Sequence, residues 1–108
     1  MDASGCSPER LKDGPALAAL FEELIVLLGL QVVGQPQWHV FPEPGGVTGM
    51  ALLAESHLTL HTFPEHGFAA LNLYCCRSRP RPDFQGLVAR HLGARGCQVR
   101  ELARGVGS

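Results

Sequence analysis

Apolar residues recur at helical spacing in two segments of this chain. In residues 16–28 they follow a period of about 3.6 residues, and the stripe consists of Leu17, Leu20, Phe21, Leu24, Leu27 and Leu28. Residues 83–92 carry a second stripe. Gly29 and Gly93 follow the two segments, as is typical of helix C-termini. A further helix start is predicted at Ser7-Pro8, with serine as the cap.

Shorter stretches of apolar or alternating residues predict strands. They are residues 30–33, 38–41, 47–54, 57–62, 68–75 and 97–102, separated by turns rich in glycine and proline. The order of helices and strands predicts an α+β two-layer sandwich, with a mainly antiparallel sheet of about four strands and two helices on one face. A second copy of the chain could cover the other face.

Composition limits the classes of function. With 108 residues, the chain is expected to be a single domain, 1–108. A net charge of −1 argues against nucleic acid as a partner, and no apolar run is long enough to span a membrane. The N-terminal residues do not resemble a signal peptide, so we expect a cytoplasmic protein.

Lys12 is the only lysine, which argues against pyridoxal chemistry. The four cysteines contain no C-x-x-C pair and are expected to be free thiols.

Chemically reactive side chains are concentrated in residues 54–66. Alternation along a strand would put His57, Thr59 and His61 on one face and Ser56, Leu58 and Leu60 on the other. Ser56 therefore could not reach His61 within a straight strand. A serine hydrolase is one reading, although the glycines of a nucleophile elbow are missing. A metal site at His57 and His61 is another, but Glu65 is the only further ligand nearby, so we expect no metal.

A third reading comes from resemblance. Residues 55–70 read ESHLTLHTFPEHGFAA, which resembles the signature block of the bacterial and archaeal S-adenosylmethionine decarboxylase proenzymes. The family also has counterparts of Gly5-Cys6, His39 and residues 46–49. The resemblance implies that the Ser56 hydroxyl attacks the Glu55 carbonyl. The chain would then separate into fragments 1–55 and 56–108, and residue 56 would become a covalent pyruvoyl group.

The resemblance also implies roles for individual residues. His61 would remove a proton during processing, with support from Thr48, where the family usually has serine. The pyruvoyl ketone would form a Schiff base with a substrate amine and accept the electrons released by decarboxylation. Cys76 would protonate the product, Glu65 would hold the ribose hydroxyls of the substrate, and Phe41 would stack on its adenine. The implied enzyme is a homodimer of processed protomers that decarboxylates S-adenosylmethionine, a small amino-acid-type substrate, in polyamine biosynthesis.

Several positions depart from the family pattern. Phe63 replaces a tryptophan, His66 replaces a tyrosine, and Cys75-Cys76-Arg77 replaces threonine-cysteine-glycine. Such changes at substrate-facing positions also fit a pyruvoyl-dependent decarboxylase of L-arginine or L-ornithine. A non-catalytic family member that acts as a partner subunit is a third possibility.

Overall fold

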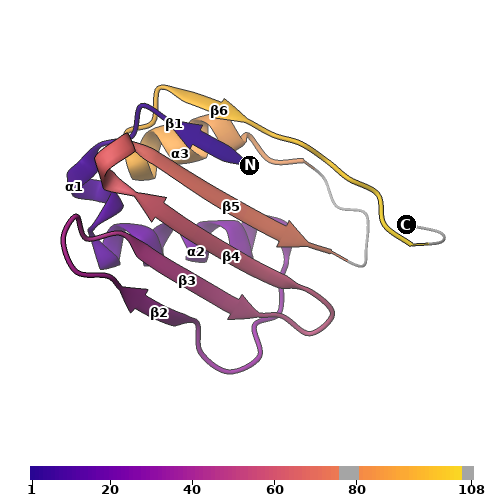
Figure 1. Cartoon of the computed structure of the whole chain (residues 1–108). Helices are drawn as coiled ribbons and strands as arrows, with labels where there is room; N and C mark the ends of the chain where they lie inside the picture. The colour runs from indigo at the N-terminus through magenta and orange to yellow at the C-terminus, as the bar shows by residue number, and fades with distance from the viewer. Residues whose placement is uncertain (76–80, 106–108) are drawn as a thin grey trace.

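The computed structural model describes residues 1–75 and 81–105, which form an open antiparallel sheet with helices on one side (Figure 1). The strand order is β2-β3-β4-β5-β1-β6. Along the chain the elements are β1 (Asp2–Ser4), α1 (Pro8–Leu11), α2 (Gly14–Leu28), β2 (Gln37–Val40), β3 (Val47–Leu52), β4 (His57–Phe63), the 3-10 turn η1 (Pro64–His66), β5 (Phe68–Tyr74), α3 (Phe84–Leu92) and β6 (Gly96–Gln98).

The helix ends follow the signals in the sequence. The Ser7 side chain accepts a hydrogen bond from the backbone N–H of Arg10 and caps α1, and Asp13 caps α2 in the same way through Ala16. Gly29 and Gly93 both adopt the left-handed conformation that ends α2 and α3. The predicted cap at Ser7 and the predicted helix ends before Gly29 and Gly93 are therefore confirmed, because local capping chemistry decides them, whereas α2 begins two residues earlier than predicted, at Gly14.

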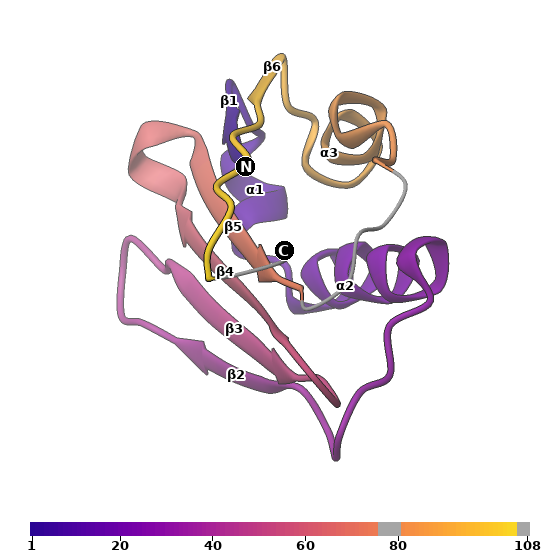
Figure 2. The same cartoon turned by 90° about the vertical axis from the view of Figure 1, so that its right-hand side faces the viewer.

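The core lies between the sheet and the helices, the two layers that Figure 2 shows from the side. On α2 the buried residues are Leu17, Leu20, Phe21, Leu24 and Leu28. Leu27 is 53% exposed, so its predicted place in the stripe was wrong. It lies at the edge of the apolar arc in the last helical turn. Each fully buried leucine contributes about 1.5–3 kcal/mol, so this layer is a major source of stability.

The alternation predicted for β4 is confirmed. Leu58 and Leu60 are fully buried against the helices, whereas His57 and His61 are exposed on the opposite face of the sheet. We call this helix-free side the open face. No helix in the described part of the chain is long and apolar enough to cross a membrane.

The predicted fold class is confirmed, but the number of strands was underestimated. The described residues contain six strands and three helices, because the three-residue strands β1 and β6 extend the sheet beyond β5 and α1 forms a separate turn. Residues 30–33 form no strand, since they contribute only an isolated bridge between Val32 and Leu53. The last strand ends at Gln98 instead of residue 102.

Strand β2 is fixed to the sheet by its tryptophan. Trp38 packs against the Phe21 ring at a centroid distance of 4.8 Å and also lies on Gly49 of β3. A methyl group at residue 49 would come within 2.3 Å of the indole, so glycine is required for this close approach. This contact sets the position of the loop after β2, which carries Phe41.

Candidate active site

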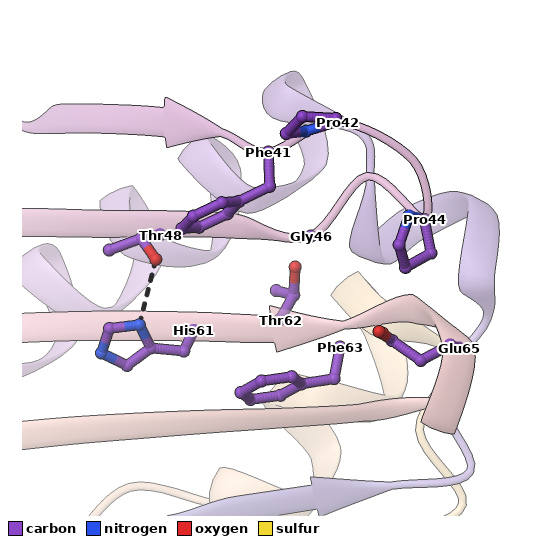
Figure 3. A pocket seen from close by; sticks show the side chains of 9 residues that line it. All are labelled: Phe41, Pro42, Pro44, Gly46, Thr48, His61, Thr62, Phe63 and Glu65. Carbon is purple, nitrogen blue, oxygen red and sulfur yellow. Dashed lines mark hydrogen bonds between the residues drawn. The ribbon is translucent and has the colours of Figure 1, made fainter.

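Thr48 and His61 form a cross-strand pair on the open face. They are directly opposed in the β3–β4 ladder, and a hydrogen bond of 3.1 Å joins Thr48 Oγ1 to His61 Nδ1 (Figure 3). The hydroxyl fixes the orientation of the imidazole and leaves the other ring nitrogen directed away from this contact. The two residues that the sequence assigned to one step are thus brought together.

A cavity of about 290 Å³ lies next to this pair, at the end of β4 where η1 begins. Figure 3 shows the residues that line it, which are Phe41, Pro42, Pro44, Gly46, Thr48, His61, Thr62, Phe63 and Glu65. The walls are mainly aromatic rings and prolines, with one carboxylate at the rim. Such a site fits a flat ring system that also carries hydroxyl groups.

The aromatic walls come from separate segments. Phe41 follows β2 and meets His39 edge-on at 4.6 Å between ring centroids. Phe63 ends β4 and lies 6.0 Å from Phe68 of β5. The family resemblance implied binding roles for Phe41 and Glu65, but it named Phe63 only as a departure at a substrate-facing position. Alternation along β4 places Phe63 on the same face as His61.

Thr62 lies beneath the cavity and hydrogen-bonds to the backbone of two other segments. It is the buried polar residue of the described core, with 4% exposure. Its hydroxyl donates to the carbonyl of Leu11 at 2.8 Å and accepts from the backbone N–H of Val47 at 2.9 Å. Gly46 lies directly against Thr62, since a methyl group there would come within 2.7 Å of the Thr62 carbonyl oxygen. The cavity walls are therefore fixed by the buried Thr62 hydroxyl, which binds main-chain groups of two other segments.

Ser56 occupies the connection between β3 and β4. It is half-buried, and its carbonyl accepts a hydrogen bond from the backbone N–H of Leu53 at 3.0 Å. The neighbouring Ala54 N–H donates to Gln31 at 3.0 Å. The Glu55–Ser56 peptide consequently lies outside both strands, where a change in the backbone leaves the β3–β4 ladder in place.

The structure does not bring Ser56 and His61 together within one chain. They are five positions apart in the sequence, a span of about 16 Å in extended chain at roughly 3.3 Å per residue. His61 adjoins the aromatic cavity, whereas Ser56 lies at the opposite end of β4. Because Ser56 precedes β4, the expectation that alternation within a straight strand keeps it from His61 stays a prediction.

The four cysteines lie in different surroundings. Cys6 is buried, and burial raises the pKa of its thiol to about 11, so it stays protonated at neutral pH. Burial also raises the pKa of Cys97.

Cys76 lies outside the described residues. The strand that leads to it does neighbour the Ser56 strand as predicted, because Tyr74 pairs with His57. Among the described residues, no three His, Cys, Asp or Glu side chains are grouped to hold a metal.

Comparison with known proteins identifies the family. The profile described as S-adenosylmethionine decarboxylase matches residues 1–105. The chain belongs to this family. It is 38% identical to the S-adenosylmethionine decarboxylase proenzyme of Bacillus cytotoxicus over 104 residues, which are 95% of this chain and 78% of that protein. It is 36% identical to proenzyme 2 of Halalkalibacterium halodurans, over 95% of this chain and 80% of that protein.

A solved structure supports the fold. The crystal structure of the adenosylmethionine decarboxylase from Aquifex aeolicus superposes with a TM-score of 0.66, at 22% identity, and covers 96% of this chain and 92% of that one. The resemblance seen in residues 55–70 is thus confirmed over nearly the whole length of the chain.

Proposed function

We propose that this protein is a proenzyme that cleaves its own backbone between Glu55 and Ser56 and then decarboxylates S-adenosylmethionine. The observation that carries the proposal is the family match over residues 1–105, with the signature serine in a connection outside the strand ladder. The aromatic cavity favours S-adenosylmethionine over arginine or ornithine, because only the first has an adenine ring and ribose hydroxyls. In this proposal Phe41 and Phe63 contact the adenine, and Glu65 binds the ribose.

The cleavage chemistry uses atoms that the chain supplies. The Ser56 hydroxyl adds to the Glu55 carbonyl, the C–N bond breaks, and an ester with a free amine replaces the amide. Removal of the Cα proton of residue 56 then expels the Glu55 carboxylate and leaves a carbon–carbon double bond. Addition of water and loss of ammonia give the pyruvoyl group. The fragments 1–55 and 56–108 stay together because β4 remains paired with β3.

The residues around Ser56 fit such a group. Serine is its precursor, and the carbonyl of residue 56 is already held by Leu53. When formed, the ketone supplies the electron sink for decarboxylation. The chain must also supply a proton to the product, a role for which Cys76 is the candidate, since the strand that precedes it ends beside His57. The free thiols of Cys6, Cys75 and Cys97 suit a reducing compartment, so we place the protein in the cytoplasm.

His61 must then come from a second copy of the chain. Within one chain it is about 16 Å from Ser56 along the strand. The open face exposes large apolar side chains, with Met50 50%, Leu52 58% and Phe63 41% exposed. A twofold axis between the two ends of β4 would bury these residues and bring His61 of each copy to Ser56 of the other. The proposed enzyme is therefore a homodimer with shared active sites.

The test combines intact mass with substrate turnover. The purified protein should show two masses that correspond to residues 1–55 and 56–108, the second with a pyruvoyl group. Carbon dioxide release from S-adenosylmethionine, arginine and ornithine should be measured in parallel, and we expect it from the first. Ser56→Ala should remain full-length and inactive. A single full-length mass with a stable dimer would instead support a non-catalytic partner subunit.

A further inference from the structure

A series of ring contacts lies beside Ser56 on the open face. His57 and Tyr74 are opposite each other in the β4–β5 ladder, and their rings stack at 5.6 Å with an interplanar angle of 7°. The guanidinium of Arg104 lies over the Tyr74 ring, 5.7 Å from its centroid. We call these three side chains the ring column. The proposed cleavage chemistry uses none of them.

Arg104 reaches this place from the C-terminal segment. After β6 the chain continues in the direction of that strand towards the end of β5, where Tyr74 lies (Figure 1). An ion pair between Arg81 and Glu101 at 3.9 Å connects the same segment to the chain before α3. Two contacts of cationic side chains therefore hold the described residues 99–105, which form no strand.

Self-cleavage would remove one of the two covalent links that hold residue 56 in position. Before cleavage, residue 56 is held from both sides by the chain. Afterwards it is the first residue of a fragment, and chain ends fray unless other contacts hold them. A carbonyl that must meet a substrate amine needs a fixed position, because a displacement of about 1 Å can cost about a hundredfold in rate. His57 is the first residue of β4 and so the nearest anchor for the new chain end.

We infer that Tyr74, supported by Arg104, is a positioning residue that holds the new N-terminus after self-cleavage by stacking on His57. The inference rests on the proposed function, because it concerns the chain end that cleavage produces. Stacking restrains the His57 side chain, and the ladder pair with Tyr74 restrains its backbone. Residue 56, one peptide bond away, is then confined. Cleavage itself does not require the column, since the intact chain already holds Ser56 on both sides.

The test compares cleaved and uncleaved protein by amide hydrogen exchange. Tyr74→Leu removes the aromatic ring but keeps an apolar strand residue, and Tyr74→Phe is the matched control that retains the ring. In the cleaved protein, Tyr74→Leu should speed exchange at residues 57 and 58 by about tenfold, as expected for local opening of a strand end. In the uncleaved Ser56→Ala background the same change should have much less effect. Tyr74→Phe should behave like the wild type in both.

Turnover provides the second measurement. Per cleaved chain, Tyr74→Leu should lower kcat about tenfold with little change in KM, as expected for a misplaced reacting group. Cleavage should still go to completion by intact mass. Arg104→Gln cannot disturb the core, because the residue is exposed. It should lower kcat about two- to fivefold, the equivalent of one exposed cation–π contact, and Arg104→Lys should restore most of that loss.

The outcomes separate the two proposals. If the wild type is not cleaved between Glu55 and Ser56, both are overturned. If the wild type is cleaved and active, but exchange at residues 57 and 58 changes equally in the cleaved and Ser56→Ala backgrounds, the column is only structural and the inference alone fails. Unchanged turnover in both Tyr74→Leu and Arg104→Gln, or loss of cleavage in Tyr74→Leu, would also overturn it.

Discussion

The two ends of β4 present different chemistry on the same face of the sheet. At the Phe63 end, residues from the β2–β3 loop, β3, β4 and η1 enclose a cavity, and Thr62 fixes its walls with buried hydrogen bonds. At the Ser56 end, the backbone leaves the ladder, and exposed ring contacts hold the neighbouring His57. The hydrogen bonds that support the Phe63 end are buried, whereas the ring contacts at the Ser56 end are exposed.

This difference matches two physical requirements. Binding of a substrate needs walls that do not move, because every side chain that must be ordered on binding lowers the affinity. Cleavage of a peptide bond by its own serine needs a backbone that can rearrange, which a paired strand forbids. Because substrate binding and backbone cleavage lie at opposite ends of β4, the fixed walls and the rearranging backbone do not interfere with each other. This arrangement also separates them by about 16 Å, so a single chain does not complete the site.

The largest predicted effect tests this separation directly. Ser56→Ala and His61→Ala should each be inactive when made alone, since one loses the group that attacks and the other the proton acceptor. When the two variants are produced together, about a quarter of the wild-type activity per dimer should return, because half of the dimers then contain one complete site. Carbon dioxide release from the purified mixture measures the recovery.

The control for this mixture is Ser56→Ala produced with a chain that carries both substitutions, which contains no complete site. Native mass spectrometry should show that mixed dimers are present in both preparations. If mixed dimers form and activity stays absent, His61 acts within its own chain or on neither, and the proposed shared site is wrong.

A change at the cavity should affect binding and leave cleavage intact. The methyl group of Gly46→Ala would come within 2.7 Å of the Thr62 carbonyl oxygen and push the loop with Pro44 and Phe41 away from β4. A displacement of about 1 Å in a site can cost about a hundredfold in rate. Because Gly46→Ala moves the walls by less than that, we expect kcat/KM to fall by about tenfold or more, mainly through KM. Steady-state kinetics on the cleaved protein provides the measurement.

Gly14→Ala is the matched control, because nothing lies within 4 Å of the added methyl group. It should leave KM unchanged. Equal KM values for Gly46→Ala and the wild type would mean that the cavity does not bind the substrate. Incomplete cleavage in Gly46→Ala would mean that the two ends are not independent.

The parts of the structure that local chemistry decides were predictable from the sequence. Capping by Ser7 and Gly29, the turn at residues 42–46 and the alternation in β4 each depend on a few neighbouring residues. The pairing of Thr48 with His61 could only be named through the family resemblance, since it depends on the register between two strands. Strand β1 is three residues long, too short for a periodic signal, and it forms only because it pairs with β5 and β6.

Two features of the site lay beyond sequence reasoning. Thr62 looks like any inward strand residue, and only the fold brings the Leu11 carbonyl to its hydroxyl across 51 positions of sequence. The contact of Arg104 with Tyr74 likewise joins the C-terminal segment to β5. Long-range contacts of single side chains leave no pattern in the sequence, so the residues that support a site are harder to predict than those that perform its chemistry.

Removal of the Thr62 hydroxyl should destabilise the cavity end of β4. Thr62→Val keeps the shape of the side chain but leaves the Val47 N–H and the Leu11 carbonyl without their buried partner. An unsatisfied buried polar group costs about 1–3 kcal/mol, so the urea midpoint of the Ser56→Ala protein, which stays in one piece, should fall accordingly. Thr62→Ser retains the hydroxyl and should recover most of the loss. An unchanged midpoint in Thr62→Val would show that water replaces the hydroxyl.

The smallest predicted effect lies in the helix layer, away from both ends of β4. Glu23 of α2 accepts hydrogen bonds from His91 Nε2 at 2.7 Å and from the Arg90 guanidinium, both on α3. The hydrogen bond from His91 is the main cause that lowers the pKa of the Glu23 carboxyl from its usual 4.5; burial opposes the shift, and Arg90 adds to it. Because the pKa of Glu23 is lower in the folded state, the ionised carboxyl stabilises the fold at pH values above its usual pKa. This stabilisation is lost as the pH falls through the lowered value.

Glu23→Gln should therefore lower the urea midpoint at pH 7 by less than Thr62→Val does, because the pair is partly exposed. The difference from the parent protein should shrink as the pH falls below 4.5, where the carboxyl of the unfolded chain is already protonated. Glu22→Gln, an exposed neighbour on the same helix, is the control and should show no such pH dependence. Cleavage and KM should stay at wild-type values, because α2 and α3 lie on the side of the sheet opposite the open face. A change in either would mean that the helix layer transmits strain to the ends of β4, and the two ends could then no longer be treated as independent of the core that carries them.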